Sequence, residues 1–310
     1  MTTQRLLSAS LPRGVLFEGP CFNPADGRLW WVDIPRSLVL RANADGSVEQ
    51  FTGPERMSAV VGTHGGLMLL TGERSLWVLD PSTSAFERLR FLVDEPLQNR
   101  CNDAKCDPFG NLWFGTMDDS ERQSLGRLWC LTADGELICY KEGIGISNTL
   151  AWDSARQRMY FADSMVGTVY VMDFRIHQGI PDLGPAEQFV GPDLAPGVPD
   201  GSAIDIEGNL WNARWDGGCV VCINPEAKVI RMLDVGARRP TSCAFYGANR
   251  STLAVTTASI GLECAAVGQF DGRVLLIDVD ATGDMVPVYK GSLDQKRPSG
   301  NDAESTHFQV

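Results

Sequence analysis

Six short apolar runs recur along the chain, and each follows a turn led by glycine or another polar residue. The runs are Arg28-Leu29-Trp30-Trp31, Gly66-Leu67-Met68-Leu69, Asn111-Leu112-Trp113-Phe114, Arg158-Met159-Tyr160-Phe161, Asn209-Leu210-Trp211-Asn212 and Thr252-Leu253-Ala254-Val255. Their second residues are separated by 38, 45, 47, 51 and 43 residues. A regular repeat of about 45 residues is typical of a four-stranded propeller blade, whereas β-helix repeats are shorter and a pair of sandwiches gives no regular spacing. The spacing therefore predicts an all-β, six-bladed β-propeller.

Short strands separated by tight turns fill each repeat. Residues 126–131 and 137–140, for example, are apolar runs joined through Ala133-Asp134-Gly135-Glu136, and Asp-Gly between such runs is a strong hairpin signal. No stretch has a sustained helical period of apolar residues. We expect residues 1–295 to form a single propeller domain, with a polar, flexible tail over 296–310. The strand after Arg13 and the strand after Asp271 are expected to share a blade and close the ring.

Charge and composition exclude several classes of partner. The net charge of -12 opposes binding to nucleic acid or to an anionic membrane, because phosphate groups would repel the chain. The sequence has no apolar run long enough to span a bilayer and no secretory signal at its start, so we expect a cytoplasmic protein. Nine cysteines without framework spacing are interpreted as reduced, mostly buried thiols, including Cys219 and Cys222. We expect a monomer or a small homo-oligomer.

Polar residues lie ten or eleven positions before the apolar runs. From Leu29, Leu112, Met159 and Leu210, this step reaches oxygen-bearing side chains, namely Glu18, Asn102, Asn148 and Asp200. The same step from the other two runs reaches Met57 and Ser242. Residues at one phase of a closed ring of repeats converge on its axis. Two carboxylates and two carboxamides are hard oxygen ligands that suit Ca²⁺, Mg²⁺ or Mn²⁺, so the pattern predicts a central metal site.

Each of these residues, taken alone, also has a purely structural interpretation. Pro199-Asp200-Gly201 alone is an ordinary β-turn, and Asn148 could form an Asx-turn. Asp103 is expected to stabilise local backbone. The shared phase favours the functional interpretation for the other positions, since four independent turn residues need not share one offset. Arg100 lies next to this set, at two residues from Asn102.

Nucleophilic catalysis through histidine is not supported by the sequence. The only histidines, His64, His177 and His307, do not lie at the axial phase. A Ser-His-Asp or Cys-His arrangement is therefore disfavoured, and no G-x-S-x-G, P-loop or Rossmann motif is present. A metal, a carboxylate base and an arginine together suit metal-assisted hydrolysis of a small carbonyl compound.

Several motifs in order give the chain a family resemblance. They are Phe17-Glu18-Gly19-Pro20, Arg100-Cys101-Asn102-Asp103-Ala104, the segment 107–117 that ends in Gly115-Thr116-Met117, Ile146-Ser147-Asn148, Pro199-Asp200-Gly201 and 240–245. In combination they resemble the gluconolactonase/regucalcin (senescence marker protein) family over about Val15 to Asp280. The resemblance implies a six-bladed propeller with one divalent metal ion in the channel.

The resemblance also implies roles for individual residues. Metal ligation falls to Glu18, Asn148 and Asp200, and substrate binding to Arg100 and Asn102. Many members have an acidic residue facing the substrate after the Gly-Thr-Met motif. Here the segment reads Asp118-Asp119-Ser120-Glu121, and Asp119 and Glu121 are the candidates for that position. A second departure is Thr149, where many members have glycine.

The expected activity is hydrolysis of a sugar lactone to the aldonic acid, with Asp200 as general base and the metal polarising the carbonyl. Calcium is the expected metal, with Zn²⁺, Mn²⁺, Mg²⁺ and Fe²⁺ as alternatives. Two other functions stay open at this point. One is a promiscuous esterase or organophosphate hydrolase of the same fold, and the other is a calcium-binding propeller without catalysis.

Overall fold

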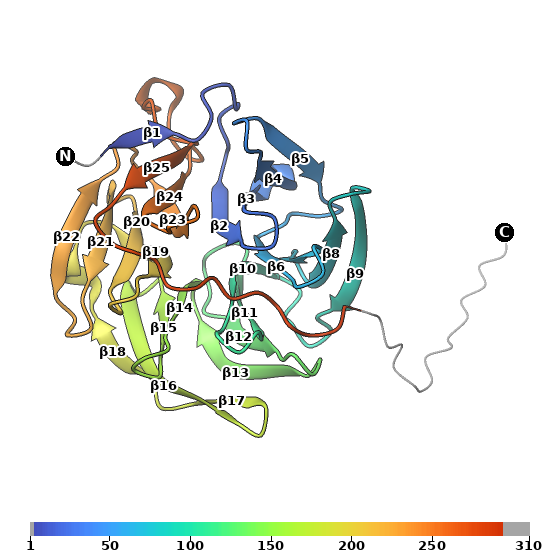
Figure 1. The fold of residues 1–310 in the computed structure, drawn as a ribbon. Coiled ribbons are helices and arrows are strands. Elements are labelled where there is room, and N and C mark those ends of the chain that lie inside the picture. The colour runs from blue at the N-terminus through green and yellow to red at the C-terminus, as the bar shows by residue number, and fades with distance from the viewer. Residues whose placement is uncertain (1–2, 294–310) are drawn as a thin grey trace.

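Six antiparallel sheets surround a central axis in the structure, a computed structural model that describes residues 3–293 (Figure 1). Each sheet is a blade with one strand nearest the axis, and the strands follow outward from it. The strands from the inside outward are β2 Phe17–Asn23, β3 Arg28–Asp33, β4 Leu38–Ala42 and β5 Val48–Thr52; β6 Ala59–Gly62, β7 Met68–Thr71, β8 Ser75–Asp80 and β9 Ala85–Phe91; β10 Asn99–Cys106, β11 Leu112–Asp118, β12 Gly126–Leu131 and β13 Leu137–Ile144; β14 Ser147–Asp153, β15 Arg158–Asp163, β16 Thr168–His177 and β17 Ile180–Leu183; β19 Val198–Ile204, β20 Leu210–Trp215, β21 Cys219–Ile223 and β22 Val229–Asp234; and β23 Pro240–Tyr246, β24 Thr252–Thr257, β25 Val274–Asp278 and β1 Gln4–Leu6. The predicted six-bladed propeller is confirmed.

Helical structure is confined to three short turns in the described part of the chain. They are η1 Ile34–Arg36, η2 Pro192–Leu194 and η3 Cys264–Ala266. A further short strand, β18 Glu187–Val190, pairs with β16. Within residues 3–293, no helix has the length and apolar character needed to cross a membrane.

The recurring apolar runs form the second strands of the blades. The six innermost strands, β2, β6, β10, β14, β19 and β23, contact one another in a closed circle. Apolar side chains fill the space between blades. Trp113 of the third blade, for example, packs on Trp152 of the fourth at a ring distance of 6.2 Å. The ring of inner strands is therefore held by packing between neighbouring sheets.

In two blades, the turn between the first and second strands contains the same set of hydrogen bonds from an aspartate. Asp107 accepts hydrogen bonds from the backbone of its hairpin, while its Oδ2 accepts one from Asn111 at 2.7 Å and one from the Trp113 indole at 2.9 Å. Asp205 holds Asn209 and Trp211 in the same way, at 2.9 Å each. The Asp-x-x-Gly-Asn-Leu-Trp pattern thus fixes both the turn and the buried tryptophan that follows it, and with them the register of the inner strand.

The ring closes at a different place from the one expected. The last strand does follow Asp271, but its partner is β1, in which Gln4 pairs with Ile277 and Leu6 with Leu275. The strand after Arg13 is instead the innermost strand of the first blade. A strand of three residues is too short to show an alternating pattern, which explains why the sequence did not reveal it.

The segment after β25 crosses the end of the channel where the inner strands finish. Backbone hydrogen bonds tie it to the fifth blade through Ile206 and to the second and third through Tyr289 and Lys290. Figure 1 shows this red segment passing over the centre of the disc. We call residues 282–290 the strap. The tail expected over 296–310, and with it His307, lies outside the described residues.

Candidate functional site

Irregular pairing aims the candidate residues into the channel. In β2, β10, β14 and β19, the inner strand has one more residue than its partner between two paired positions, which is a β-bulge. Glu18 and Asn148 are the last paired residues before their bulges, whereas Asn102 and Asp200 are the first residues inside theirs. Bulges bend a strand and redirect side chains, and they are common next to active sites. The four positions therefore lie at equivalent levels near the start of each inner strand.

Hydrogen bonds connect Arg100, Asn102 and Asn148 directly. The Arg100 guanidinium donates to Asn102 Oδ1 at 2.9 Å, and Asn102 Nδ2 donates to Asn148 Oδ1 at 3.2 Å. Asn148 Nδ2 donates in turn to Ser164 Oγ at 2.9 Å, and Ser164 Oγ donates to the Pro199 carbonyl at 2.6 Å. The chain of contacts runs from the third blade through the fourth to the residue before Asp200, so the structure brings these predicted residues together.

Buried negative charge gathers at the same level. Asp200 is 5% exposed and Asp103 is 8% exposed. Burial raises the pKa of both carboxyl groups, and the charge of Glu18 raises that of Asp200 further. Burial and the nearby charge of Asp103 likewise raise the pKa of Glu18 to about 8. The charge of Asp103 therefore makes it harder for both Glu18 and Asp200 to ionise, and the charge of Glu18 does the same for Asp200.

The cations of the channel are too few to balance these groups. Among the described residues, none of Glu18, Asp103 and Asp200 forms a salt bridge, and Asp103 Oδ2 is buried without a hydrogen-bond partner. Lys105 is the nearby amine, and it donates to the Ser202 carbonyl instead. An uncompensated buried carboxylate is costly, so the donor set fits a bound cation. Asp103 belongs to this cluster, and its carboxyl also accepts hydrogen bonds from the backbone of Ala104 and Leu150, in agreement with the expected role in stabilising local backbone.

The metal site itself stays a prediction. Within the part of the chain that the structure describes, no group of three or more His, Cys, Asp or Glu side chains could hold a metal ion. The proposed ligand set contains only two carboxylates, and its third ligand is the amide oxygen of Asn148. It is therefore not a group of three such side chains.

The segment after the Gly-Thr-Met motif separates into distinct roles. Asp118 is buried and accepts hydrogen bonds within its own loop, including one from Ser120 Oγ at 2.7 Å. Asp119 reaches the site, where it accepts from Arg100 Nε at 2.9 Å. Glu121 is exposed, has a left-handed backbone with φ 56°, and contributes its charge near Arg100.

Arg56 also lies at this end of the channel, which we call the mouth and which carries Arg100 and Asp119. The sequence did not predict Arg56 as a site residue. Both nitrogens of its guanidinium end donate to the two oxygens of Asp119, each at 3.1 Å, and its Nε contacts Glu73. Asp119 is thus held between Arg56 and Arg100. The sequence did contain an indication of its position, because Arg56 directly precedes Met57, the residue at the axial phase in the second blade. Met57 packs into a core cluster and leaves Arg56 as the polar group that this blade presents.

The histidines and cysteines take no part in this arrangement. His64 and His177 lie away from the channel end that holds Asp200, at a hairpin and at the end of β16. All nine cysteines are free, and six of them are buried, including Cys219 and Cys222. The described cysteines thus agree with the predicted reduced thiols.

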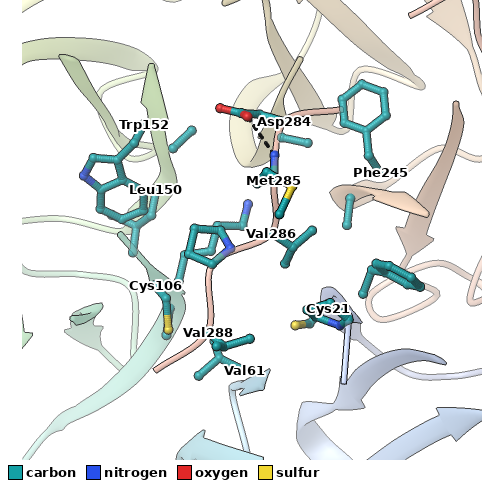
Figure 2. Close-up of a pocket in the computed structure, with 18 of the residues that line it drawn as sticks. Cys21, Val61, Cys106, Leu150, Trp152, Phe245, Asp284, Met285, Val286 and Val288 are labelled. Atoms are coloured by element: carbon teal, nitrogen blue, oxygen red, sulfur yellow. Dashed lines mark hydrogen bonds between the residues drawn. The ribbon is translucent and has the colours of Figure 1, made fainter. Parts of the chain in front are cut away.

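A second feature of the channel lies at its other end, under the strap. A cavity of about 720 Å³ is lined by residues from the ends of the inner strands, such as Cys21 and Cys106, and by Met285, Val286 and Val288 of the strap (Figure 2). None of the three proposed metal ligands lines it. Asp103 and Gly19, the residue after Glu18, do line it, so the cavity extends along the channel from the strap to the acidic cluster.

The fold and the site together define a class of six-bladed propellers with acidic and amide side chains at one end of the axial channel. Residues 16–259 match the family model described as SMP-30/Gluconolactonase/LRE-like region. The chain therefore belongs to this family, as its motifs predicted.

Named relatives extend the match to nearly the full chain. The chain is 32% identical over 294 residues to pentonolactonase XacC of Haloferax volcanii, which covers 91% of this chain and 96% of that protein. It is 32% identical over 256 residues to L-arabinolactonase of Azospirillum brasilense, with coverages of 81% and 83%. Among solved structures, regucalcin of Agrobacterium tumefaciens, described as a calcium-binding protein, has a TM-score of 0.87 at 28% identity and coverages of 93% and 97%.

Proposed function

We propose that this protein is a metal-dependent hydrolase that opens a sugar lactone to the aldonic acid. The observation that carries the proposal is the acidic pair of the partly buried Glu18 and the buried Asp200 beside the hydrogen-bonded Arg100, Asn102 and Asn148. Relatives named as pentonolactonase and L-arabinolactonase support the choice of substrate class. A site that only stored an ion would need no arginine, so Arg100 favours catalysis over calcium binding alone.

The residues fit one divalent metal ion, with Glu18, Asn148 and Asp200 as its ligands. The ion would supply positive charge near the lactone carbonyl and stabilise the negative charge that develops on its oxygen. Calcium is our first choice, because all three ligands are hard oxygen donors and a similar solved structure is described as calcium-binding. Zn²⁺, Mn²⁺, Mg²⁺ and Fe²⁺ are the alternatives to be tested.

Asp200 acts as the general base in this proposal. One carboxylate oxygen takes a proton from a water molecule while the water oxygen attacks the carbonyl carbon of the lactone. The bond between that carbon and the ring oxygen then breaks, and the ring oxygen takes up the proton to become a hydroxyl group. Water and lactone are consumed together, and the aldonic acid is the single product.

Arg100 and Asn102 hold the substrate. The guanidinium and amide groups donate hydrogen bonds that sugar hydroxyls can accept, and this fixes the carbonyl against the base. Asp119 and Glu121 line the mouth from the third blade, where Asp119 would accept from a substrate hydroxyl. We place the enzyme in the cytoplasm, where its free cysteines would stay reduced.

A proton-release assay tests the proposal against its alternatives. The purified protein is incubated with gluconolactone, with pentonolactones and with paraoxon, each with and without a chelator. Release with lactones that the chelator abolishes supports the proposal. Release with paraoxon alone indicates a phosphoesterase. Calcium binding without release from any substrate indicates a binding protein and overturns the catalytic assignment.

A further inference from the structure

Thr149, the residue after Asn148, has an unusual backbone. It lies in the bulge of β14 with φ 58°, in the left-handed region, and its side chain is fully buried. A β-branched side chain rarely adopts this conformation, which persists only where the surroundings enforce it. In the first blade the equivalent residue, after Glu18, is Gly19 with φ 55°. The left-handed bend is thus common to both positions, and the side chain is particular to Thr149.

The Thr149 hydroxyl joins two blades at the site. Its Oγ1 donates a hydrogen bond to the backbone carbonyl of Asp200, in the next blade. It also accepts from Asn212 Nδ2 at 3.1 Å and from Ser202 Oγ at 3.3 Å. Asn212 Nδ2 donates to the same Asp200 carbonyl at 3.0 Å. All members of this network are buried, so none of these bonds competes with bulk water.

The Thr149 hydroxyl links two of the proposed metal ligands. Thr149 is covalently next to one proposed metal ligand, Asn148, and is hydrogen-bonded to the backbone of another, Asp200. Those ligands come from different sheets, and their spacing depends on how the sheets pack. A direct link between them removes that freedom, as a supporting hydrogen bond does for metal ligands in general.

We propose that Thr149 is a positioning residue that fixes Asp200 relative to Asn148, through the hydrogen bond from its hydroxyl to the Asp200 carbonyl. The inference rests on the proposed function, because it takes both neighbours as ligands and Asp200 as the base. Thr149 itself contacts neither Arg100 nor Asn102, so its effect should fall on turnover and metal affinity and leave substrate binding largely unchanged.

Three variants isolate the hydroxyl. Thr149→Val keeps the branched shape and removes the donor, whereas Thr149→Ser keeps the donor. Thr63→Val is a matched control, since the Thr63 hydroxyl is also buried and donates to a backbone carbonyl, that of Leu67 at 2.7 Å, in a hairpin at the other end of the propeller. The measurements are kcat and KM with a lactone that the wild type hydrolyses, and the affinity for Ca²⁺ and Mn²⁺ by calorimetry after chelation.

We expect Thr149→Val to lower kcat and metal affinity by about 10- to 100-fold, the usual effect of losing a group that supports a metal ligand, with KM little changed. Thr149→Ser should restore most of both, and Thr63→Val should change neither. We expect the hydrogen bond from Asn148 to Ser164 to remain in every variant, and thermal melting checks that each one folds.

The possible results distinguish the positioning role of Thr149 from the proposed lactonase function. If the wild type hydrolyses the lactone and Thr149→Val has the same kcat and metal affinity as the wild type, the positioning role is wrong and the lactonase assignment stands. If the wild type binds metal but hydrolyses no lactone, the function fails and the calorimetric comparison still decides the role of Thr149. Failure of Thr149→Ser to recover would also contradict it, because the hydroxyl would not be the cause. A wild type with neither metal binding nor turnover would overturn both.

Discussion

Replacing Glu18 by glutamine should stabilise the metal-free protein and weaken its response to metal. Glu18 shares the channel with Asp103 and Asp200, and among the described residues none of the three has a salt-bridge partner. Glutamine has nearly the same shape but carries no charge. The substitution therefore removes from the metal-free protein an acid group whose ionisation folding suppresses, and removes a ligand from the metal-bound one, with opposite effects on stability.

The pKa of Glu18 sets the size of the effect. Burial and Asp103 raise it from an ordinary value of 4.5 to about 8. The unfolded chain then loses its proton well below the pH at which the folded chain does, so the stability of the metal-free wild type falls as pH rises from 4.5 to about 8. With about 1.4 kcal/mol for each pKa unit, Glu18→Gln should stabilise the metal-free protein by about 3 kcal/mol at pH 7 and about 1 kcal/mol at pH 5.

Thermal melting in chelator and in excess metal measures both effects. A gain of about 3 kcal/mol in a chain of this length raises Tm by about 5 °C. Metal at 100 times its Kd adds about 2.7 kcal/mol to the wild type and much less to Glu18→Gln. Glu136→Gln, at an exposed hairpin, is the control and should behave like the wild type. A metal-free Glu18→Gln that melts below the wild type, or that gains as much from metal, would refute the electrostatic argument.

Three further predictions concern other parts of the molecule. Asp200→Asn should lower kcat by about 10²- to 10⁴-fold while the protein stays folded by circular dichroism, and substantial turnover would exclude Asp200 as the base. Arg100→Ala should raise KM by about tenfold or more, because it removes hydrogen bonds from a charged donor; an unchanged KM in steady-state kinetics would remove Arg100 from the site. Deleting residues 1–10 should lower Tm by several degrees and promote aggregation detectable by light scattering, because it exposes the edge of β25. A deletion variant that melts and scatters like the full chain would show that β1 does not protect that edge.

Most of the fold follows from repetition in the sequence. Leu29, Leu112 and Leu210 each lie in a second strand that pairs with an axial strand, so one phase predicted the blades and the strands that line the axis. Repetition carries no information about the closing strand, because β1 pairs with residues near the other terminus. The same limit applies to Arg56, whose partner Asp119 lies 63 residues away in a neighbouring blade.

The individual roles of acidic residues were harder to predict. Asp118 and Asp119 are adjacent and chemically identical, yet one is turned into its own loop and the other toward Arg100. Strand alternation predicts that neighbours face opposite ways, but it does not say which one faces the channel. Asp103 was expected to serve the backbone, and its burial next to Glu18 became apparent only once the sheets were assembled.

The small difference between the offsets of ten and eleven has a structural cause. Asn102 and Asp200 lie one position further along their strands than Glu18 and Asn148, which shortens the offset by one, and their hairpins are one residue longer, which restores it. The remaining difference arises because Leu112 and Leu210 are the first residues of their strands, whereas Leu29 and Met159 are the second. The first and fourth blades face each other across the ring, because the inner strands contact in chain order. Glu18 and Asn148 therefore approach the axis from opposite sides, and Asp200 enters from the blade next to Asn148. The Thr149 hydrogen bond joins this adjacent pair, and Glu18 faces them across the channel without a comparable link to either. Metal affinity should accordingly depend on how the first blade packs against its neighbours as well as on the ligands themselves.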